Sequence, residues 1–419
     1  MTGRAAAGLG RSAALAVIAA LVVVAPAHAA SPLAGRVRAE SPLTARATAV
    51  PRLTARVKAA VRPLGGRVSV QVTDLRARRT VVALRARRSR PLGSTTKLLT
   101  AAAALRLLGP GYVLGTELLR SAPIDAAGVL PGDLILRGGG DPLLGDAQLS
   151  ELADQLAGVR EVTGAIVGDE SRFDAIRTGP SGDGAFDPEL GGPLSALAYE
   201  RGAQVHGGPP QADPARAAAA RFDDVLEARG VVIRGVPRAG VAPAGAALLT
   251  SADSAPLAEL LEAMLKPSDD WIAEMLTKGL APAPGSTAAG AAIVRREAAR
   301  LGARASLVDG SGLDPRDRGS AAGLVSLLRR MRGVDAFFSA LALPGRPGTL
   351  HDRLTTGRAR RHCRGKTGTL PSGRVSVLAG YCEGRNGHTY AFAVMAQGAA
   401  VSRALVAQDR VARALAAAR

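Results

Sequence analysis

The chain is organised around the segment Pro91-Leu92-Gly93-Ser94-Thr95-Thr96-Lys97-Leu98-Leu99-Thr100. Small polar residues precede a run of helix formers over residues 98–107, which predicts a helix that starts near Ser94. Lys97 then lies one turn along, on the same face as Ser94. A serine at a helix N-terminus beside a proton-accepting amine is an activated nucleophile. Because Ser-x-x-Lys also arises by chance in chains of this length, the rest of the sequence has to support this interpretation.

The composition of the chain limits the classes of function that it can have. The 419 residues include 54 Lys and Arg against 35 Asp and Glu, a formal net charge of +19, and only five of the basic residues are lysine. Nucleic-acid binding is disfavoured because aromatic residues make up 3% and no basic helix carries base-reading polar side chains. An anionic cell envelope is a better partner for such a surface. Two of the five lysines, Lys97 and Lys366, lie in candidate catalytic motifs.

The N-terminus has the pattern of a targeting segment. Two arginines precede an apolar run over residues 13–25, which ends in Ala27-His28-Ala29. This pattern predicts a signal peptide over residues 1–29 and a mature chain that begins at Ala30. The alternative is an uncleaved anchor. No later stretch is long and apolar enough to span a bilayer, so we expect an exported protein that is extracellular or cell-wall-associated.

Periodicity predicts an α/β (α+β) protein. Residues 30–50 are rich in Pro, Ser, Ala and Arg and indicate a flexible lead-in. Strands near both ends of the chain, with helices between them, favour one domain formed by residues 51–112 and 251–419. Alternating short strands and helices over residues 113–250 indicate an inserted domain. We expect helices over 53–61, 98–107, 147–157, 214–229, 255–265, 271–280, 287–301, 321–331 and 402–418, and strands over 67–72, 80–84, 134–137, 162–167, 231–233, 361–370, 374–381 and 389–395.

Two further motifs support the interpretation of Ser94 and Lys97 as a catalytic pair. Lys366-Thr367-Gly368-Thr369 lies on a C-terminal strand, and Lys266-Pro267-Ser268-Asp269-Asp270 lies just before a helix. The set Ser-x-x-Lys, Ser-x-Asn and Lys-Thr-Gly is the signature of penicillin-binding proteins and class A β-lactamases. The first and third members are intact here and occur in that order.

From about residue 50 to its C-terminus the chain resembles the D-alanyl-D-alanine carboxypeptidase/endopeptidase family, the class C low-molecular-mass penicillin-binding proteins. The shared stretches are residues 136–142, 308–313, 348–350 and 365–370. The resemblance implies a penicillin-binding-protein/β-lactamase-like peptidase domain with an inserted smaller α/β domain. It also implies peptidoglycan stem peptides as substrate, β-lactams as covalent inhibitors, and no cofactor. No Cys/His cluster has metal-ligand spacing.

The resemblance also implies roles for individual residues. Ser94 would be the nucleophile, Lys97 its base, and Ser268 the relay of a proton to the leaving amine. Lys366 would complete the basic cluster and help to hold the substrate's terminal carboxylate. The backbone N–H groups of Ser94 and Thr369 would form the oxyanion hole. The implied substrate-binding residues are Thr367, Gly368 and Thr369.

Asp270 departs from the family pattern, which has Asn at this position. An ionised Asp cannot donate a hydrogen bond to a substrate carbonyl, and it repels a substrate carboxylate. It could instead pair with Lys97. We therefore expect Asp270→Asn to raise activity, unless Asp270 is protonated or its charge is offset on Lys97.

Three functions remain open. The leading hypothesis is a serine-type D-Ala-D-Ala carboxypeptidase or endopeptidase. The second is a binding protein of the same fold that is weak or inactive because of Asp270. The third is a β-lactamase, for which residues 187–190 resemble the deacylating glutamate loop; however, in class A enzymes that loop follows the second motif, and here it precedes Ser268.

The two cysteines, Cys363 and Cys382, fit an oxidising compartment. Pro371-Ser372-Gly373-Arg374 indicates a tight turn, and folding the strands about its centre places the two cysteines opposite each other. We expect a disulfide between them that braces the strand of Lys366. The alternative is a pair of buried free thiols.

Overall fold

The computed structural model describes residues 42–180 and 188–419. The predicted signal peptide, the cleavage before Ala30, most of the predicted lead-in, and Asp187 lie outside the described residues. Contacts group residues 46–419 into one unit. Among the residues described, no helix combines the length and the apolar character that a membrane span requires.

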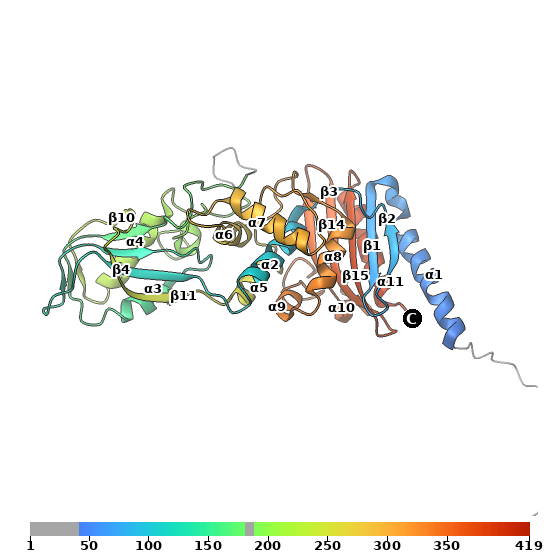
Figure 1. The fold of residues 1–419 in the computed structure, drawn as a ribbon, viewed down its shortest axis with the longest axis horizontal. Coiled ribbons are helices and arrows are strands. Elements are labelled where there is room, and N and C mark those ends of the chain that lie inside the picture. The colour runs from blue at the N-terminus through green and yellow to red at the C-terminus, as the bar shows by residue number, and fades with distance from the viewer. Residues whose placement is uncertain (1–41, 181–187) are drawn as a thin grey trace, which may run out of the picture. The chain divides into compact units, whose positions relative to one another are not determined.

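A five-stranded antiparallel sheet joins the two ends of the chain. Its order is β13-β14-β15-β1-β2, so the N-terminal hairpin pairs with the C-terminal strands through β1 and β15. Figure 1 shows these blue and red strands side by side. The strands are β1 (Val68–Asp74), β2 (Arg79–Leu84), β13 (Cys363–Leu370), β14 (Val375–Glu383) and β15 (Thr389–Gln397).

Successive side chains of β15 point to opposite faces of the sheet, and each face is covered by a different apolar cluster. Phe392 and Val394 belong to one apolar cluster, together with α1 (Pro42–Val61) and α11 (Val401–Ala416). Ala393 and Met395, on the opposite face, belong to a second cluster with the central helices. Those helices are α2 (Thr96–Leu107), α5 (Leu257–Leu265), α6 (Asp270–Leu280), α7 (Thr287–Arg300), α8 (Ala321–Met331) and α9 (Asp335–Ser339).

Residues 115–253 form a second sheet with its own apolar cluster. The sheet order is β10-β8-β6-β4-β11, with α3 (Asp146–Asp154) and α4 (Pro214–Glu227) packed in the same cluster. Asp213 caps α4 by accepting the N–H of Arg216, as its position before Pro214 predicts. The strands are β4 (Gly115–Arg120), β6 (Leu134–Arg137), β8 (Ile166–Asp169), β10 (Arg238–Ala239) and β11 (Ala247–Asp253), and β5 (Val129–Leu130), β7 (Glu161–Val162) and β9 (Val232–Ile233) form a small third sheet.

The remaining elements connect these parts. They are the 3-10 helices η1 (Arg62–Arg67), η2 (Gly93–Thr95) and η3 (Tyr199–Gly202), the short strands β3 (Arg90–Pro91) and β12 (Arg318–Gly319), and helix α10 (Ala359–His362). The mixed helix-and-sheet fold class is confirmed. The domain boundaries stay a prediction.

Three local expectations were wrong. Helix α1 begins at Pro42 rather than near residue 53, because the Ala- and Arg-containing lead-in is itself helix-forming. Strand β13 starts only at Cys363, after the short helix α10. The strand expected over 162–167 is divided into β7 and β8 at Gly164, where a Cβ would lie 2.6 Å from the Gly132 carbonyl carbon. The helix expected to start near Ser94 is present: Ser94 lies in the 3-10 turn η2, which continues directly into α2 at Thr96.

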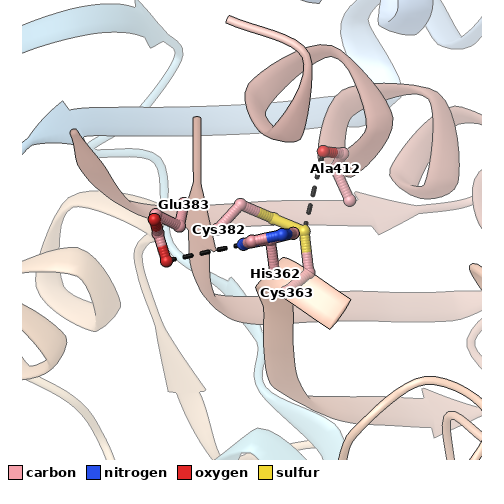
Figure 2. Close-up of a disulfide and its surroundings, with 5 residues drawn as sticks. All are labelled: His362, Cys363, Cys382, Glu383 and Ala412. Atoms are coloured by element: carbon pink, nitrogen blue, oxygen red, sulfur yellow. Dashed lines mark hydrogen bonds and ion pairs between the residues drawn. A yellow bond between two sulfur atoms is a disulfide. The ribbon is translucent and has the colours of Figure 1, made fainter. Parts of the chain in front are cut away.

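A disulfide joins the two cysteines. Cys363 is paired with Cys382 across β13 and β14, and their sulfur atoms are 2.07 Å apart. Figure 2 shows the bond beside the Ala412 carbonyl of α11. A cross-link that closes a loop of this size stabilises a fold by about 3 kcal/mol. Because β13 is an edge strand, the bond fixes one end of the strand that carries Lys366.

Candidate active site

The serine turn lies directly against the edge strand β13. Gly93 has a φ of +51°, and a Cβ there would be 3.2 Å from the Thr369 nitrogen. A Cβ at Gly368 would be 2.7 Å from the Leu92 carbonyl oxygen and 3.1 Å from the Ser94 nitrogen. Glycine at these two positions therefore permits a backbone approach that a side chain would block. This approach places the amides of Ser94 and Thr369 in one neighbourhood, and Ser94 remains half-buried.

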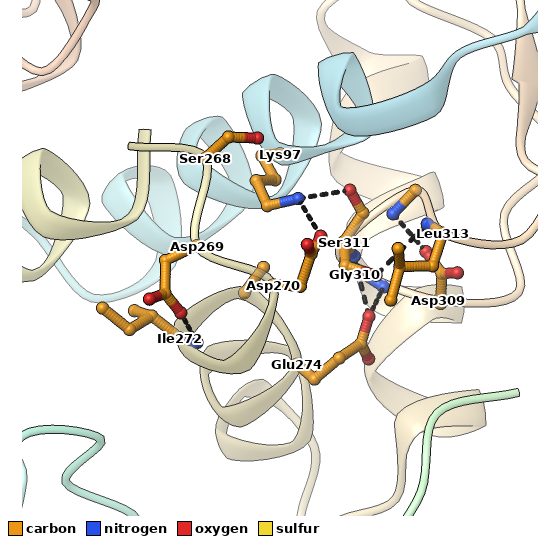
Figure 3. A network of polar contacts seen from close by, with 12 residues as sticks. Lys97, Ser268, Asp269, Asp270, Ile272, Glu274, Asp309, Gly310, Ser311 and Leu313 are labelled. Atoms are coloured by element: carbon orange, nitrogen blue, oxygen red, sulfur yellow. Dashed lines mark hydrogen bonds and ion pairs between the residues drawn. The ribbon is translucent and has the colours of Figure 1, made fainter. Parts of the chain in front are cut away.

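Lys97 is fully buried on α2 and is held by two acceptors. Its Nζ donates to Asp270 Oδ1 at 2.5 Å and to the Ser311 carbonyl at 2.7 Å (Figure 3). Burial raises the pKa of Asp270, and the charge of Lys97 opposes this shift. When ionised, the Asp270 carboxyl group supplies a counter-charge to a lysine that is shielded from water.

Lys366 is also fully buried, but its partners are neutral. Its Nζ donates to Ser268 Oγ at 2.7 Å and to the Thr367 carbonyl at 2.9 Å. Burial, followed by the charge of Lys97, holds the pKa of Lys366 well below its ordinary value. A lysine in this setting can exchange a proton with the Ser268 hydroxyl at neutral pH.

The loop that carries Ser268 is held in place by contacts with the region formed by residues 115–253. Ser268 has a φ of +73°, a conformation that a non-glycine residue adopts only when its surroundings enforce it. Next to it, Asp269 caps α6 by accepting the Ile272 N–H at 2.9 Å, and its other oxygen pairs with Arg201 from η3. The Arg201 guanidinium also lies 5.9 Å from the centre of the Trp271 ring. No pattern in the sequence indicates this role for Arg201.

Glu274 supports the other side of the site. It lies one turn after Asp270 on α6 and is fully buried, and its Oε1 accepts the N–H groups of Gly310 and Ser311 at 2.9 and 2.8 Å. These bonds hold the loop whose Ser311 carbonyl receives Lys97 (Figure 3). Burial, then the charge of Asp309, raises the pKa of Glu274 to about 8. Sequence reasoning missed Glu274, although its i, i+4 spacing from Asp270 was a usable signal.

The arrangement brings the candidate residues to one place. The Ser94 turn, Lys97 and Asp270 meet where α2 and α6 begin, and Lys366, Ser268 and Gly368 face them from β13 and its neighbouring loop. The exposed side chain of Thr369 lies at the edge of the sheet. Within residues 42–180 and 188–419, no group of three His, Cys, Asp or Glu side chains could hold a metal ion. Acyl transfer to a serine is chemistry that such a set of amines and hydroxyls can perform.

Comparison with known proteins finds a family whose model matches most of this chain. The model of the D-Ala-D-Ala carboxypeptidase 3 (S13) family matches residues 55–187 and 199–418. A D-alanyl-D-alanine carboxypeptidase of Actinomadura sp. (strain R39) is 29% identical over 409 residues, covering 76% of this chain and 75% of the relative.

Solved structures show the same fold. Penicillin binding protein 4 of Haemophilus influenzae superposes with a TM-score of 0.72 at 23% identity, covering 85% of this chain and 97% of that one. The same protein in complex with a β-lactam gives a TM-score of 0.67 at 22% identity over the same shares of the two chains.

Proposed function

The chain belongs to the D-Ala-D-Ala carboxypeptidase 3 (S13) family, and we propose that it hydrolyses the D-Ala-D-Ala bond of peptidoglycan stem peptides through an acyl-enzyme on Ser94. One observation carries the proposal: the backbone of Gly368 and Thr369 lies against the Ser94 turn, with a fully buried lysine on each side. The same acyl transfer would open cross-links between stem peptides, so the proposal includes endopeptidase action.

In the first half-reaction, Ser94 Oγ attacks the carbonyl carbon of the penultimate D-alanine. Lys97 takes the hydroxyl proton, a step that requires its amine to be neutral, and the amides of Ser94 and Thr369 stabilise the oxyanion. When the tetrahedral intermediate collapses, the C–N bond breaks. The leaving amine takes a proton from the Ser268 hydroxyl, and the ammonium form of Lys366 replaces that proton across their 2.7 Å hydrogen bond.

In the second half-reaction, water attacks the ester on Ser94. The acyl–oxygen bond breaks, the serine recovers its proton, and the shortened peptide leaves as a carboxylate. Thr367, Gly368 and Thr369 provide the strand edge against which the substrate is held, and a substrate carboxylate near Lys366 would favour the charged form of that lysine.

Intact-mass measurement after incubation with benzylpenicillin tests the nucleophile. The expected result is a stoichiometric adduct on the wild type and none on Ser94→Ala. Release of D-alanine from a peptide ending in D-Ala-D-Ala then tests turnover. An adduct that persists in Ser94→Ala would place the nucleophile elsewhere.

The ion pair between Lys97 and Asp270 favours a second candidate, a stem-peptide-binding protein with little activity. A charged ammonium cannot accept the serine proton, so the pair opposes the first step. Peptide binding without release of D-alanine would support this alternative.

We also propose that the protein is exported after removal of residues 1–29, and that residues 113–250 form an insert in a peptidase domain. Mass spectrometry of the secreted protein should give a chain that begins at Ala30. A secreted chain that retains Met1 would contradict the proposed cleavage.

A further inference from the structure

The turn between β2 and β3 forms an arginine-lined pocket, away from the serine site. The pocket has a volume of about 590 Å³, and the side chains of Arg85, Arg87 and Arg88 contribute to its wall. All three side chains are exposed. The other lining residues are small or polar and include no aromatic: Gln71, Thr80, Ala83, Ala86 and Ala322.

Backbone carbonyls hold this turn in place. Arg85 donates from Nε to the Val68 carbonyl at 2.8 Å and from Nη2 to the Gly65 carbonyl at 2.5 Å. The N–H of Arg88 donates to the Arg85 carbonyl at 3.0 Å, which closes the turn. The guanidinium groups are therefore presented by a fixed backbone, without carboxylates to position them.

Arg90 adds a buried charge beneath the turn. Its side chain is 3% exposed and donates to Ser69 Oγ at 2.8 Å and to the Gly66 carbonyl at 2.9 Å. Burial, followed by the charges of Arg88, Arg85 and Arg318, lowers the pKa of Arg90 to about 10. These arginines are thus close enough to repel one another.

None of the described acidic residues forms a salt bridge with the arginines of this turn. Salt bridges elsewhere pair arginine with acidic residues, as in Arg353 with Asp409 and Arg221 with Asp146. None of those described involves Arg85, Arg87, Arg88, Arg90 or Arg318. Clustered like charges destabilise a free protein, and an anion that bridges them removes the repulsion.

We propose that this pocket binds the phosphate groups of a base-free phosphodiester polymer. Guanidinium groups match phosphate oxygens through paired N–H donors, and several on one rigid turn suit a ligand with repeated charges. A nucleic acid would need stacking surfaces for its bases, and the pocket wall has no aromatic side chain. The pocket would hold the enzyme on an anionic envelope polymer, independently of the chemistry at Ser94.

The test is titration of the purified protein with poly(glycerol phosphate) over a series of salt concentrations. Arg87→Gln combined with Arg88→Gln should weaken binding about 30-fold. The same pair should lower the slope of log affinity against log salt by about two, because two phosphate contacts are lost. Arg360→Gln combined with Arg361→Gln is the matched control, since it removes two adjacent exposed arginines next to β13, at the opposite edge of the sheet.

The expected control result is wild-type affinity, and Ser94→Ala should bind as the wild type does even if the proposed reaction is wrong. Equal weakening by the two arginine pairs would overturn the proposal, because net charge alone would then explain binding. No binding by the wild type, or tighter binding of a single-stranded oligonucleotide, would also overturn it. Unchanged melting temperatures of both double variants would show that folding does not cause the difference.

Discussion

The two buried lysines of the site have the same exposure and different electrostatics. Lys97, between α2 and α6, has a carboxylate 2.5 Å from its Nζ, whereas Lys366, on β13, has only a hydroxyl and a carbonyl. Desolvation penalises the charged form of both, but only Lys97 has a counter-charge in direct contact. Two lysines that are equally buried can therefore have different electrostatic surroundings, because the groups in contact with their Nζ atoms differ.

The largest expected effect is a difference in how much each of the two lysines contributes to the stability of the fold. Lys97→Met leaves the half-buried Asp270 carboxylate without its partner and should lower the free energy of unfolding by about 2 kcal/mol. Lys366→Met removes a desolvated amine with neutral partners and should cost less than about 1 kcal/mol. Urea denaturation measures both. Benzylpenicillin acylation should fall about 10²–10⁴-fold in each variant, because each loses a proton-transfer group.

The double variant Lys97→Met with Asp270→Asn is the control for this difference. It should recover most of the stability lost in Lys97→Met, since no carboxylate remains unpaired. Equal losses in the two single variants would mean that Asp270 is already uncharged and that the two lysine environments are alike.

A second test removes the negative charge beside Lys97, so that both lysines have neutral partners. Asp270→Asn keeps a side-chain oxygen near Lys97 but removes the negative charge, which favours a neutral amine. It also restores an amide donor, and such a donor is worth about 10²–10³ in rate when it acts in the transition state. Acylation by benzylpenicillin and D-alanine release should therefore rise, by at least about tenfold.

Side-by-side acylation rates of wild type and Asp270→Asn decide this point, with Ser94→Ala as the blank. A fast wild type that the substitution slows would show that Asp270 is an adapted catalytic residue.

A third test acts on the Lys366 side without touching that lysine. Arg201→Met removes the partner of Asp269 and should loosen the loop that holds Ser268 at its positive φ. Acylation should slow about tenfold because Ser268 is no longer held against Lys366. The KM for a D-Ala-D-Ala peptide should change little, and Arg201→Lys should recover part of the rate. Loss of rate equal to that of Lys366→Met would mean that the loop had unfolded.

The smallest expected effect concerns pH on the Lys97 side. The pKa of Glu274 is raised to about 8, so the folded state retains a proton that the unfolded chain has released. The contribution of Glu274 to the free energy of unfolding should therefore fall as pH rises from about 5 to about 8, and stay level above that range.

Glu274→Gln keeps the acceptor for Gly310 and Ser311 and should flatten this slope by about 1 kcal/mol per pH unit within that range. Denaturation midpoints of both proteins at several pH values measure it. A variant with the wild-type slope would assign the pH dependence to another group.

The sequence predicted the parts of the site that are local and missed those that depend on contacts. The three motifs, the helix after Ser268 and the opposition of Cys363 to Cys382 follow from spacing and turn chemistry. The 3-10 turn at Ser94 could not be predicted, because the approach of β13 in the folded protein makes the positive φ of Gly93 necessary. The partners of Asp269 and Asp270 lie 68 and 173 residues away, beyond the range of any periodic pattern.

The pairing of β1 with β15 has a consequence for the order in which the protein can mature. Val68 pairs with Ala396, so the central sheet is incomplete until nearly the whole chain is available. Ser94 lies near one end of this sequence span and Lys366 near the other. Long-range pairing of this kind makes folding slow, and the catalytic centre is among the last features to form. A partly synthesised chain therefore has no assembled catalytic centre, and activity would begin only once β15 has been made and paired.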